Sequence, residues 1–167
     1  IIYFASLFMI TSGANADGLY LAAGFTNSKG KESAVEYTST NTIILAGYDL
    51  NDFFGLEAEI SSVLTKDTVT KNSVNLKVGK SHSAAFIKAA YPLSSDLSVH
   101  ARIGQSNGKA SASAGGVVIS LDKRTTAYGF GTTFAASDNL SIRADYTVAD
   151  YGSTDGTILA LMAVFKF

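Results

Sequence analysis

Apolar and polar residues alternate with a period of two along most of this chain, which is the pattern of β-strands with one apolar face. The alternation recurs in eight segments that polar stretches separate. The apolar positions are alternate residues within 19–25, 44–50, 56–60, 87–91, 97–103, 128–134, 140–148 and 159–167. We therefore predict an all-β protein with eight antiparallel strands.

Three segments of similar sequence predict tight turns at one side of the sheet. They are YDLNDFFGLEAEI (48–60), YPLSSDLSVHARI (91–103) and FAASDNLSIRADY (134–146). Each runs from an aromatic residue, through a polar turn around Asp52, Asp96 or Asp138, into an alternating strand. Longer polar stretches, predicted as loops, lie at 26–42, 65–73, 105–124 and 150–156. This alternation of short and long connections is typical of an up-and-down barrel.

The other face of the predicted strands carries all of their charges. These residues are Asp49, Glu57, Glu59, Lys88, His100, Arg102, Arg143, Asp145 and Lys166. In a soluble barrel, for example of lipocalin type, the charged face would meet water, whereas in an outer-membrane barrel it lines the interior. The charged face also carries glycines, and the apolar face carries wide aromatic residues. In a soluble barrel the aromatic residues would fill the interior and the glycines would lie outside, which packs poorly, so this distribution favours the membrane orientation. The aromatic residues Tyr48, Tyr91, Phe134 and Tyr146 are expected near strand ends, as interfacial girdles require.

Two segments depart from the regular pattern. Val74, Leu76 and Val78 have the opposite parity to Ile87 and Ala89, which predicts a β-bulge near GKSHSAA (79–85). In the last strand, residues 160, 162 and 164 are Ala, Met and Val, so its interior face is apolar as well.

Composition narrows the class of protein. Only 16% of the residues are charged, the formal net charge is −1, and no basic surface for nucleic acid is indicated. The absence of cysteine excludes disulfides and thiolate metal sites. Low charge with many Tyr and Phe residues fits a protein that is solvated partly by lipid.

The first residues form a separate unit. IIYFASLFMI followed by TSGANA resembles an apolar signal segment with a small-residue cleavage site, so we predict a signal peptide remnant at 1–16 and a barrel domain at 17–167. The alternative is an apolar N-terminal helix, buried or spanning a membrane. The apolar run is short for a spanning helix, which needs about 20 residues.

Four motifs carry a family resemblance: AGYDLNDFFGLEAE, AAYPLSSDLSVHARIG, YGFGTTFAASDNLSIRADY and the terminal VFKF. Together they resemble the small eight-stranded outer-membrane barrels of the opacity-protein and outer-membrane-protein-A type, a porin-like β-barrel family. The resemblance implies the outer membrane of a Gram-negative bacterium, contact with lipid and lipopolysaccharide, and insertion by the barrel-assembly machinery. It also implies that Phe165 and Phe167 form a C-terminal assembly signal. We expect a monomer.

The charged interior face supplies the candidate functional residues. Asp49, Glu57, Glu59, Lys88, His100, Arg102, Arg143 and Asp145 are expected to form an ion-pair network, because an unpaired charge in a narrow interior is costly. One interpretation is a structural plug that fills the barrel, since eight strands leave room only for side chains. The other is a gate, in which a change of partners opens a narrow water path.

No catalytic, cofactor or metal site is predicted. A metal site would need ligands that His100 and His82, which lies near a predicted loop, do not supply in this cysteine-free chain. A lipid A-modifying enzyme of deacylase type is the alternative, but its Ser–His–Glu set would have to face lipid, whereas His100 faces inward. The stretches 26–42 and 105–124 could also bind an unidentified surface ligand, as in an adhesin. We expect a non-enzymatic, surface-exposed barrel with at most a narrow pore.

Overall fold

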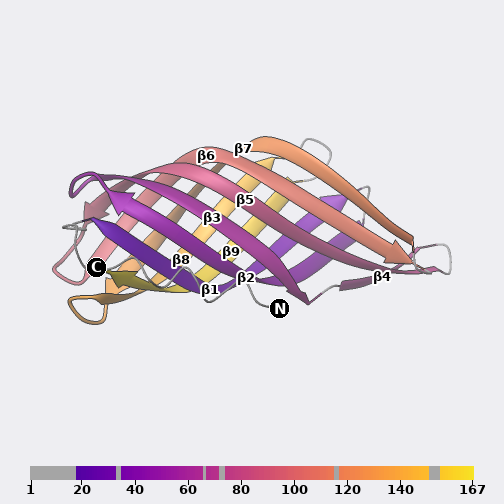
Figure 1. Cartoon of the computed structure of the whole chain (residues 1–167), viewed down its shortest axis with the longest axis horizontal. Helices are drawn as coiled ribbons and strands as arrows, with labels where there is room; N and C mark the ends of the chain where they lie inside the picture. Colours follow the sequence, from indigo (N-terminus) through magenta and orange to yellow (C-terminus); the bar gives the residue numbers. More distant parts are fainter. Residues whose placement is uncertain (1–17, 33–34, 66, 72–73, 115–116, 151–154) are drawn as a thin grey trace.

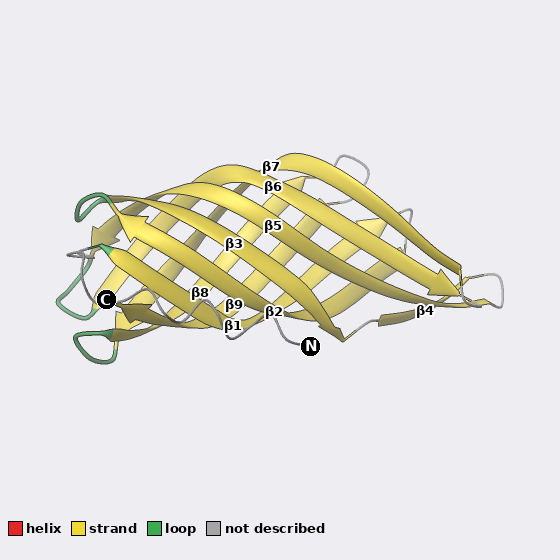
Figure 2. Cartoon of the chain, viewed as in Figure 1, coloured by secondary structure: helices red, strands yellow, loops and turns green. Residues whose placement is uncertain are grey.

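The computed structural model describes residues 18–32, 35–65, 67–71, 74–114, 117–150 and 155–167. These ranges consist almost entirely of antiparallel strands, which wind around a common axis (Figures 1 and 2). The predicted signal segment, 1–16, lies outside the described residues. Nowhere in the described ranges is there a helix long and apolar enough to cross a membrane.

The strands form a closed barrel. They are β1 (Leu19–Glu32), β2 (Val35–Asp49), β3 (Phe54–Thr65), β4 (Asp67–Lys71), β5 (Val74–Pro92), β6 (Leu97–Ala114), β7 (Val117–Ala135), β8 (Leu140–Asp150) and β9 (Asp155–Lys166). Both β3 and β4 pair with β5, so together they fill one position in the ring. Because β1 pairs with both β2 and β9, the ring has no open edge. The predicted eight-stranded, antiparallel, up-and-down barrel is confirmed.

The three short turns lie at one end of the barrel and share one hydrogen-bonding pattern. The first turn residue donates its N–H to the carbonyl four residues later, as Leu50 does to Phe54. A polar side chain at the next position, which is Asn51, Ser94 or Ser137, then accepts backbone N–H groups from the end of the turn. The side chains of the predicted turn residues Asp52, Asp96 and Asp138 accept none of these hydrogen bonds. The similar sequences therefore encode the same turn through a different residue from the one expected.

The polar stretches 26–42, 65–73 and 105–124 are mostly strand, so their prediction as loops is wrong; most of 150–156 lies outside the described residues. The described parts of 26–42 belong to β1 and β2, and those of 105–124 belong to β6 and β7. In 65–73, the short strand β4 pairs with β5. Serine and threonine pair well across strands, so the strands continue in polar sequence. The change to polar residues therefore marks the end of the apolar band and not the end of the strands.

The irregularity predicted near 79–85 lies on one edge of β5 only. Toward β6 the register runs without a break from Lys77 opposite Ser113 to Pro92 opposite Ser98. On the other edge the pairing changes from Ser61 opposite His82 in β3 to Asp67 opposite Val78 in β4, which breaks the register beside this stretch. A further shift lies between Thr40 and Asn41, where β2 pairs with β3. A change of apolar parity does not require a backbone break once a strand leaves the lipid, because neither face must then be apolar.

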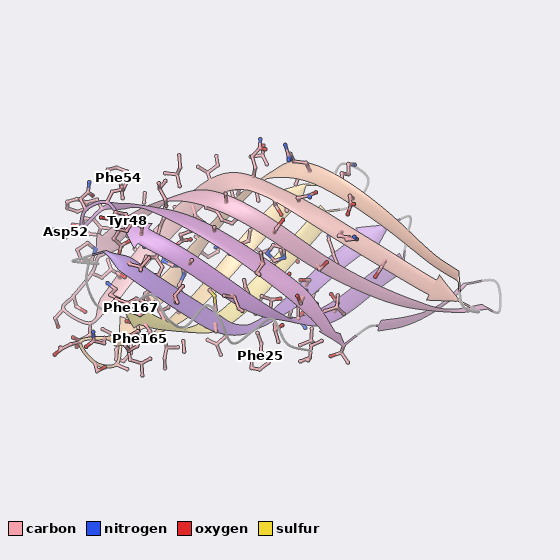
Figure 3. All side chains as sticks on the ribbon, viewed as in Figure 1. Phe25, Tyr48, Asp52, Phe54, Phe165 and Phe167 are labelled. Carbon is pink, nitrogen blue, oxygen red and sulfur yellow. The ribbon has the colours of Figure 1, made fainter. Side chains whose placement is uncertain are left out.

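The barrel is inverted relative to a soluble protein. Outward side chains are apolar and exposed, including Phe25 (59% exposed), Phe130 (65%) and Leu161 (60%), whereas the charged residues are buried inside. Figure 3 shows Phe25 and Phe54 at the outer margin of the ribbon. This arrangement fits the predicted membrane orientation and excludes the lipocalin-type one.

Aromatic residues flank the turn end of the barrel. Tyr48 and Tyr91 lie beside turns, and Phe165 and Phe167 make an edge-to-face contact with ring centroids 5.2 Å apart (Figure 3). Tyr146 is an exception to the prediction, since it lies within β8 and packs on Phe130, 5.5 Å away.

The apolar interior of the last strand has a packing partner. Within the lumen, side chains of β1, β2 and β9 form a buried apolar cluster made of Tyr20, Ala22, Ile43, Leu45, Ala160, Met162 and Val164. One side of the interior is therefore closed by apolar packing, and most of the interior charges lie on β3, β5, β6 and β8.

Candidate functional site: a charged network across the lumen

The eight charged residues expected inside the barrel form one connected network. They come from β2, β3, β5, β6 and β8, and alternation along each strand turns their side chains into the lumen. Only Asp49 lies partly exposed at the turn end, where 27% of its side chain is accessible. The same parity places Tyr20, Ser61, His82 and Thr147 in the network, and these four residues were not among those predicted from the sequence.

The centre of the network is the pair of Glu57 and Arg143. Arg143 Nη1 donates to Glu57 Oε1 over 2.5 Å, and Nη2 donates to Oε2 over 3.0 Å. Their strands, β3 and β8, occupy opposite positions in the ring. The two side chains therefore meet across the full width of the lumen, and this bidentate geometry is the strongest form of such a pair.

Asp145 holds the other side of Arg143. Its carboxylate accepts hydrogen bonds from Arg143 Nε over 2.9 and 3.0 Å, and it lies 2.8 Å from His100 Nε2. Space for this group comes from Gly131 on β7. A Cβ built there would overlap Asp145 Oδ1 and lie 2.6 Å from His100 Nε2.

Arg102 extends the network away from the turns. Its Nη1 donates to Glu59 over 2.6 Å, its Nη2 donates to Thr147 over 2.6 Å, and its guanidinium lies 4.3 Å from the ring centre of Phe86. Arg102 Nη1 also lies 3.5 Å from both Glu57 and Asp145, which links this arm to the centre. The planar, multidentate guanidinium suits this bridging position.

Beyond Glu59 lies a hydrogen-bonded trio that was not predicted from the sequence. His82 Nε2 is 2.8 Å from Glu59 Oε1, and its Nδ1 is 2.8 Å from Ser61 Oγ. His82 was placed near a loop, but β5 extends to Val74 and the side chain is buried inside. Ser61 Oγ also accepts the backbone N–H of His82 over 3.0 Å, and neither Ser61 nor His82 lines either of the two cavities described below.

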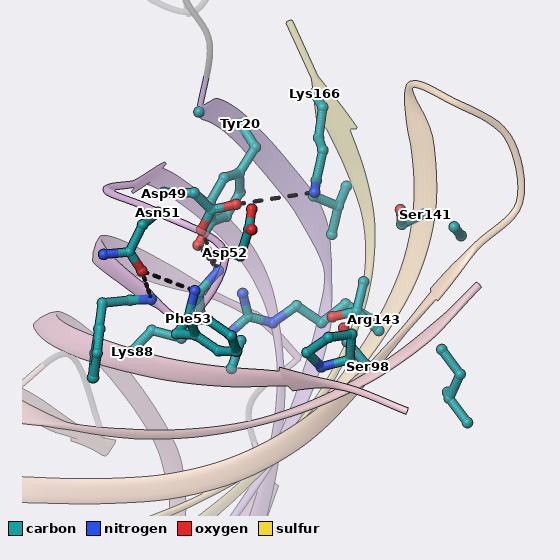
Figure 4. Close-up of a pocket in the computed structure, with 18 of the residues that line it drawn as sticks. Tyr20, Asp49, Asn51, Asp52, Phe53, Lys88, Ser98, Ser141, Arg143 and Lys166 are labelled. Carbon is teal, nitrogen blue, oxygen red and sulfur yellow. Dashed lines mark hydrogen bonds and ion pairs between the residues drawn. The ribbon is translucent and has the colours of Figure 1, made fainter. Parts of the chain in front are cut away.

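At the turn end, the network forms the floor of a vestibule of about 650 Å³ (Figure 4). Lys88 Nζ donates to Asp49 over 2.7 Å and to the Tyr20 hydroxyl over 2.8 Å, and it lies 3.8 Å from Glu57 Oε1. Tyr20 in turn donates to the same Glu57 oxygen over 2.6 Å. At the mouth, Lys166 Nζ is 4.0 Å from Asp49. The vestibule therefore ends on paired charges.

Within the described ranges, His, Asp and Glu do not form a group of three or more that could hold a metal ion. The acidic residues are instead bound to Arg, Lys and His, as their salt bridges show.

Comparison with known proteins identifies the family. Residues 2–167 match the family described as "Outer membrane protein beta-barrel domain". The chain belongs to this family. It is therefore an outer-membrane β-barrel protein of Gram-negative bacteria, so its exposed apolar wall faces lipid and its buried charges lie inside the barrel. A search of curated protein sequences found no match.

Solved structures of other outer-membrane barrels have the same fold. Neisserial surface protein A is 18% identical, with 93% of this chain and 100% of that chain covered and a TM-score of 0.76. Ail, the attachment invasion locus protein of Yersinia pestis, solved in complex with the heparin analogue sucrose octasulfate, is 19% identical, with coverage of 90% and 99% and a TM-score of 0.69. OprG from Pseudomonas aeruginosa is 11% identical, with coverage of 90% and 96% and a TM-score of 0.65. At these identities the likeness shows the fold alone.

Proposed function

We propose that this outer-membrane protein is a structural, surface-exposed barrel whose lumen is plugged by the charged network. The observation that supports the proposal is the bidentate pair of Arg143 and Glu57, which joins opposite strands across the lumen. Tyr20, Arg102 and Asp145 surround this pair, so the charges are satisfied by protein groups. A lumen filled in this way leaves at most a narrow path for ions.

Conductance in planar bilayers tests the plug. Purified, folded protein is expected to give little or only small conductance at concentrations where a large open porin gives stable channels. Heat-modifiability on gels confirms that the barrel is folded in the same sample. Large, long-lived channels from the folded protein would refute the plugged lumen.

A second candidate function is a gate, and one contact favours it. Lys88 Nζ lies 3.8 Å from the same Glu57 oxygen that Arg143 binds, so this oxygen has another cation within reach, in addition to Arg102, which lies 3.5 Å from the other Glu57 oxygen. If the network gates a path, Arg143→Ala releases this oxygen to Lys88 and raises the frequency of channel openings. Lys88→Met removes that alternative partner and lowers the frequency. Equal conductance in both variants and the native protein would exclude the gate.

We propose a structural role for the trio of Ser61, His82 and Glu59, in preference to lipid A modification. Ser61 and His82 are cross-strand partners, and all three side chains are buried in the lumen. Ser61→Ala in the expressed protein should therefore leave the mass spectrum of lipid A identical to that given by the native protein. An acyl chain that is removed only in the presence of Ser61 would overturn this assignment.

An adhesin-like role is supported by the extended strands. β7 pairs with β8 only from Ala127 onward, so β5, β6 and β7 continue beyond that point as an extension of the barrel (Figure 1). The structure of Ail with a heparin analogue suggests sulfated polysaccharide as a first ligand to test. Retention of the folded protein on immobilised heparin at physiological salt would support this role, and elution without delay would count against it.

We further propose that Phe165 and Phe167 are read by the barrel-assembly machinery. Both side chains are exposed at the turn end of β9 and contact each other there. Phe167→Ala should lower the amount of assembled protein in the outer membrane, while the purified variant refolds normally in detergent. Normal assembly of the double alanine variant would refute the signal.

A further inference from the structure

A groove of about 600 Å³ crosses the lipid-facing wall of the barrel. The cross-strand register places three small outward residues side by side along its floor, namely Ala46, Ala58 and Ala85. Larger side chains border this floor on both sides. The row toward the turns consists of Tyr48, Leu56, Ile87, Ile103 and Tyr128, and the row away from them begins with Ile44 and Ile60.

One end of the groove is polar and cationic. Across β6, the alanine row continues at Gln105, and the neighbouring row continues through Asn107 to Arg124 on β7. All three side chains are exposed and line the groove. Within the described part of the chain, Arg124 has no carboxylate partner. A guanidinium at this place is therefore available for an anion, and the two amides are available for hydroxyl groups.

The position of the groove identifies the leaflet that it faces. At the opposite end of β6 and β7 the turns follow the apolar band directly, whereas at the groove's end the paired strands continue past the band to Ala114 and Val117. In outer-membrane barrels the short turns are periplasmic and the long excursions extracellular. Ile103 and Tyr128 are the last large apolar residues before Gln105 and Arg124, so the polar end lies at the outer edge of the apolar band. An apolar groove that ends at this edge matches a lipid of the outer leaflet, with its chain along the alanines and its head group at Arg124.

We propose that this groove binds a phosphorylated glycolipid of the outer leaflet, of the lipid A class. One acyl chain lies over Ala46, Ala58 and Ala85, Arg124 pairs with a phosphate, and Gln105 and Asn107 donate hydrogen bonds to sugar hydroxyls. The assignment rests on the outer-membrane location and is independent of the plug. An ordinary anionic phospholipid would supply the phosphate without the sugar, so the two lipids can be told apart.

Competition between the two lipids tests the site. The folded protein is reconstituted in phosphatidylcholine bilayers that contain equal amounts of lipid A and phosphatidylglycerol, and the lipid retained by each barrel is measured by native mass spectrometry. Arg124→Gln removes the cation, and Ala85→Leu fills the floor. Each variant has a matched control at an exposed residue outside the groove. Lys29→Gln, on β1, removes a cation, and Ala163→Leu enlarges an alanine on β9, which occupies the ring position opposite β5.

The expected result is preferential retention of lipid A by the native barrel and by both controls. Loss of one charge-assisted hydrogen bond should lower retention about tenfold in Arg124→Gln, and Ala85→Leu should lower it as well. Heat-modifiability must be unchanged in every variant, which ensures that folded barrels are compared. Equal retention of phosphatidylglycerol and lipid A would overturn the glycolipid assignment. Equal loss in the controls and the groove variants, or no loss in any variant, would overturn the site.

Discussion

Substitution of Glu57 by Gln is the most direct test of the lumenal network. The glutamine keeps the size of the side chain but removes its charge. In the native barrel, Glu57 is 4% exposed and accepts hydrogen bonds from Tyr20 and from two nitrogens of Arg143. The variant leaves Arg143 with Asp145 as its only carboxylate in hydrogen-bonding contact. Removal of one partner from a buried ion pair costs about 3–5 kcal/mol, and we expect this decrease in the free energy of unfolding.

Urea unfolding of the protein in lipid vesicles measures this decrease. The fraction of folded barrel is followed by the heat-modifiable band on gels and by tyrosine fluorescence, since the chain has no Trp. The double variant Glu57→Gln/Arg143→Met should recover part of the loss, because no guanidinium is then left without its Glu57 partner, while Asp145 keeps His100 at 2.8 Å and Arg102 at 3.5 Å. Asp49→Asn is the matched control at the partly exposed rim, where an ion pair contributes about 1 kcal/mol or less.

Two outcomes would refute this reasoning. If Glu57→Gln is no more destabilising than Asp49→Asn, the central pair does not hold the barrel together. If the effects of Glu57→Gln and Arg143→Met are additive in the double variant, the two residues are not energetically coupled. In either case the distances seen in the lumen would not reflect a stabilising network.

Three further predictions concern packing, turns and lipid contact. Gly131→Val places methyl groups against Asp145 and should destabilise the barrel by about 1–3 kcal/mol in the same unfolding assay; an unchanged urea midpoint would show spare room in the lumen. Asn51→Ala removes the acceptor of two turn N–H groups and should lower stability by about 1 kcal/mol, whereas Asp52→Ala, which changes no cap, should be neutral. Leu161→Arg, within the lipid-facing band, should cost about 2–4 kcal/mol, against about 0–1 kcal/mol for Leu140→Arg near the turn end; equal costs would contradict the predicted depth of the two residues.

Much of the fold could be read from the chain because the deciding signals are local. Side chains alternate along any strand, so the parity of Glu57 and Glu59 already separated them from Leu56 and Ala58. Similar turn sequences likewise predicted similar turns. The positions of the strand ends were predicted wrongly because β1, β2, β6 and β7 continue in polar sequence. There the strands are stabilised by backbone pairing with their neighbours, which leaves no apolar pattern in the sequence.

The site was predictable as a set of residues but not as a set of contacts. Alternation could have added Tyr20 and His82 to the set, since both share the inward parity of their strands. Their positions in the sequence do not predict that Tyr20 contacts Glu57 or that His82 lies between Glu59 and Ser61. Those contacts join strands that are far apart in the sequence.

By itself, the sequence determined the strands, the turns, the face of each strand that carries charge and, through its composition, the likeness to a lipid-solvated barrel. These properties depend on neighbouring residues along the chain. The tertiary structure alone decided which charges meet, because closure of β1 on β9 and the stagger between strands set the positions that face each other across the lumen. Arg143 reaches Glu57 for this reason, and the row of alanines forms only when the three strands β2, β3 and β5 align in register.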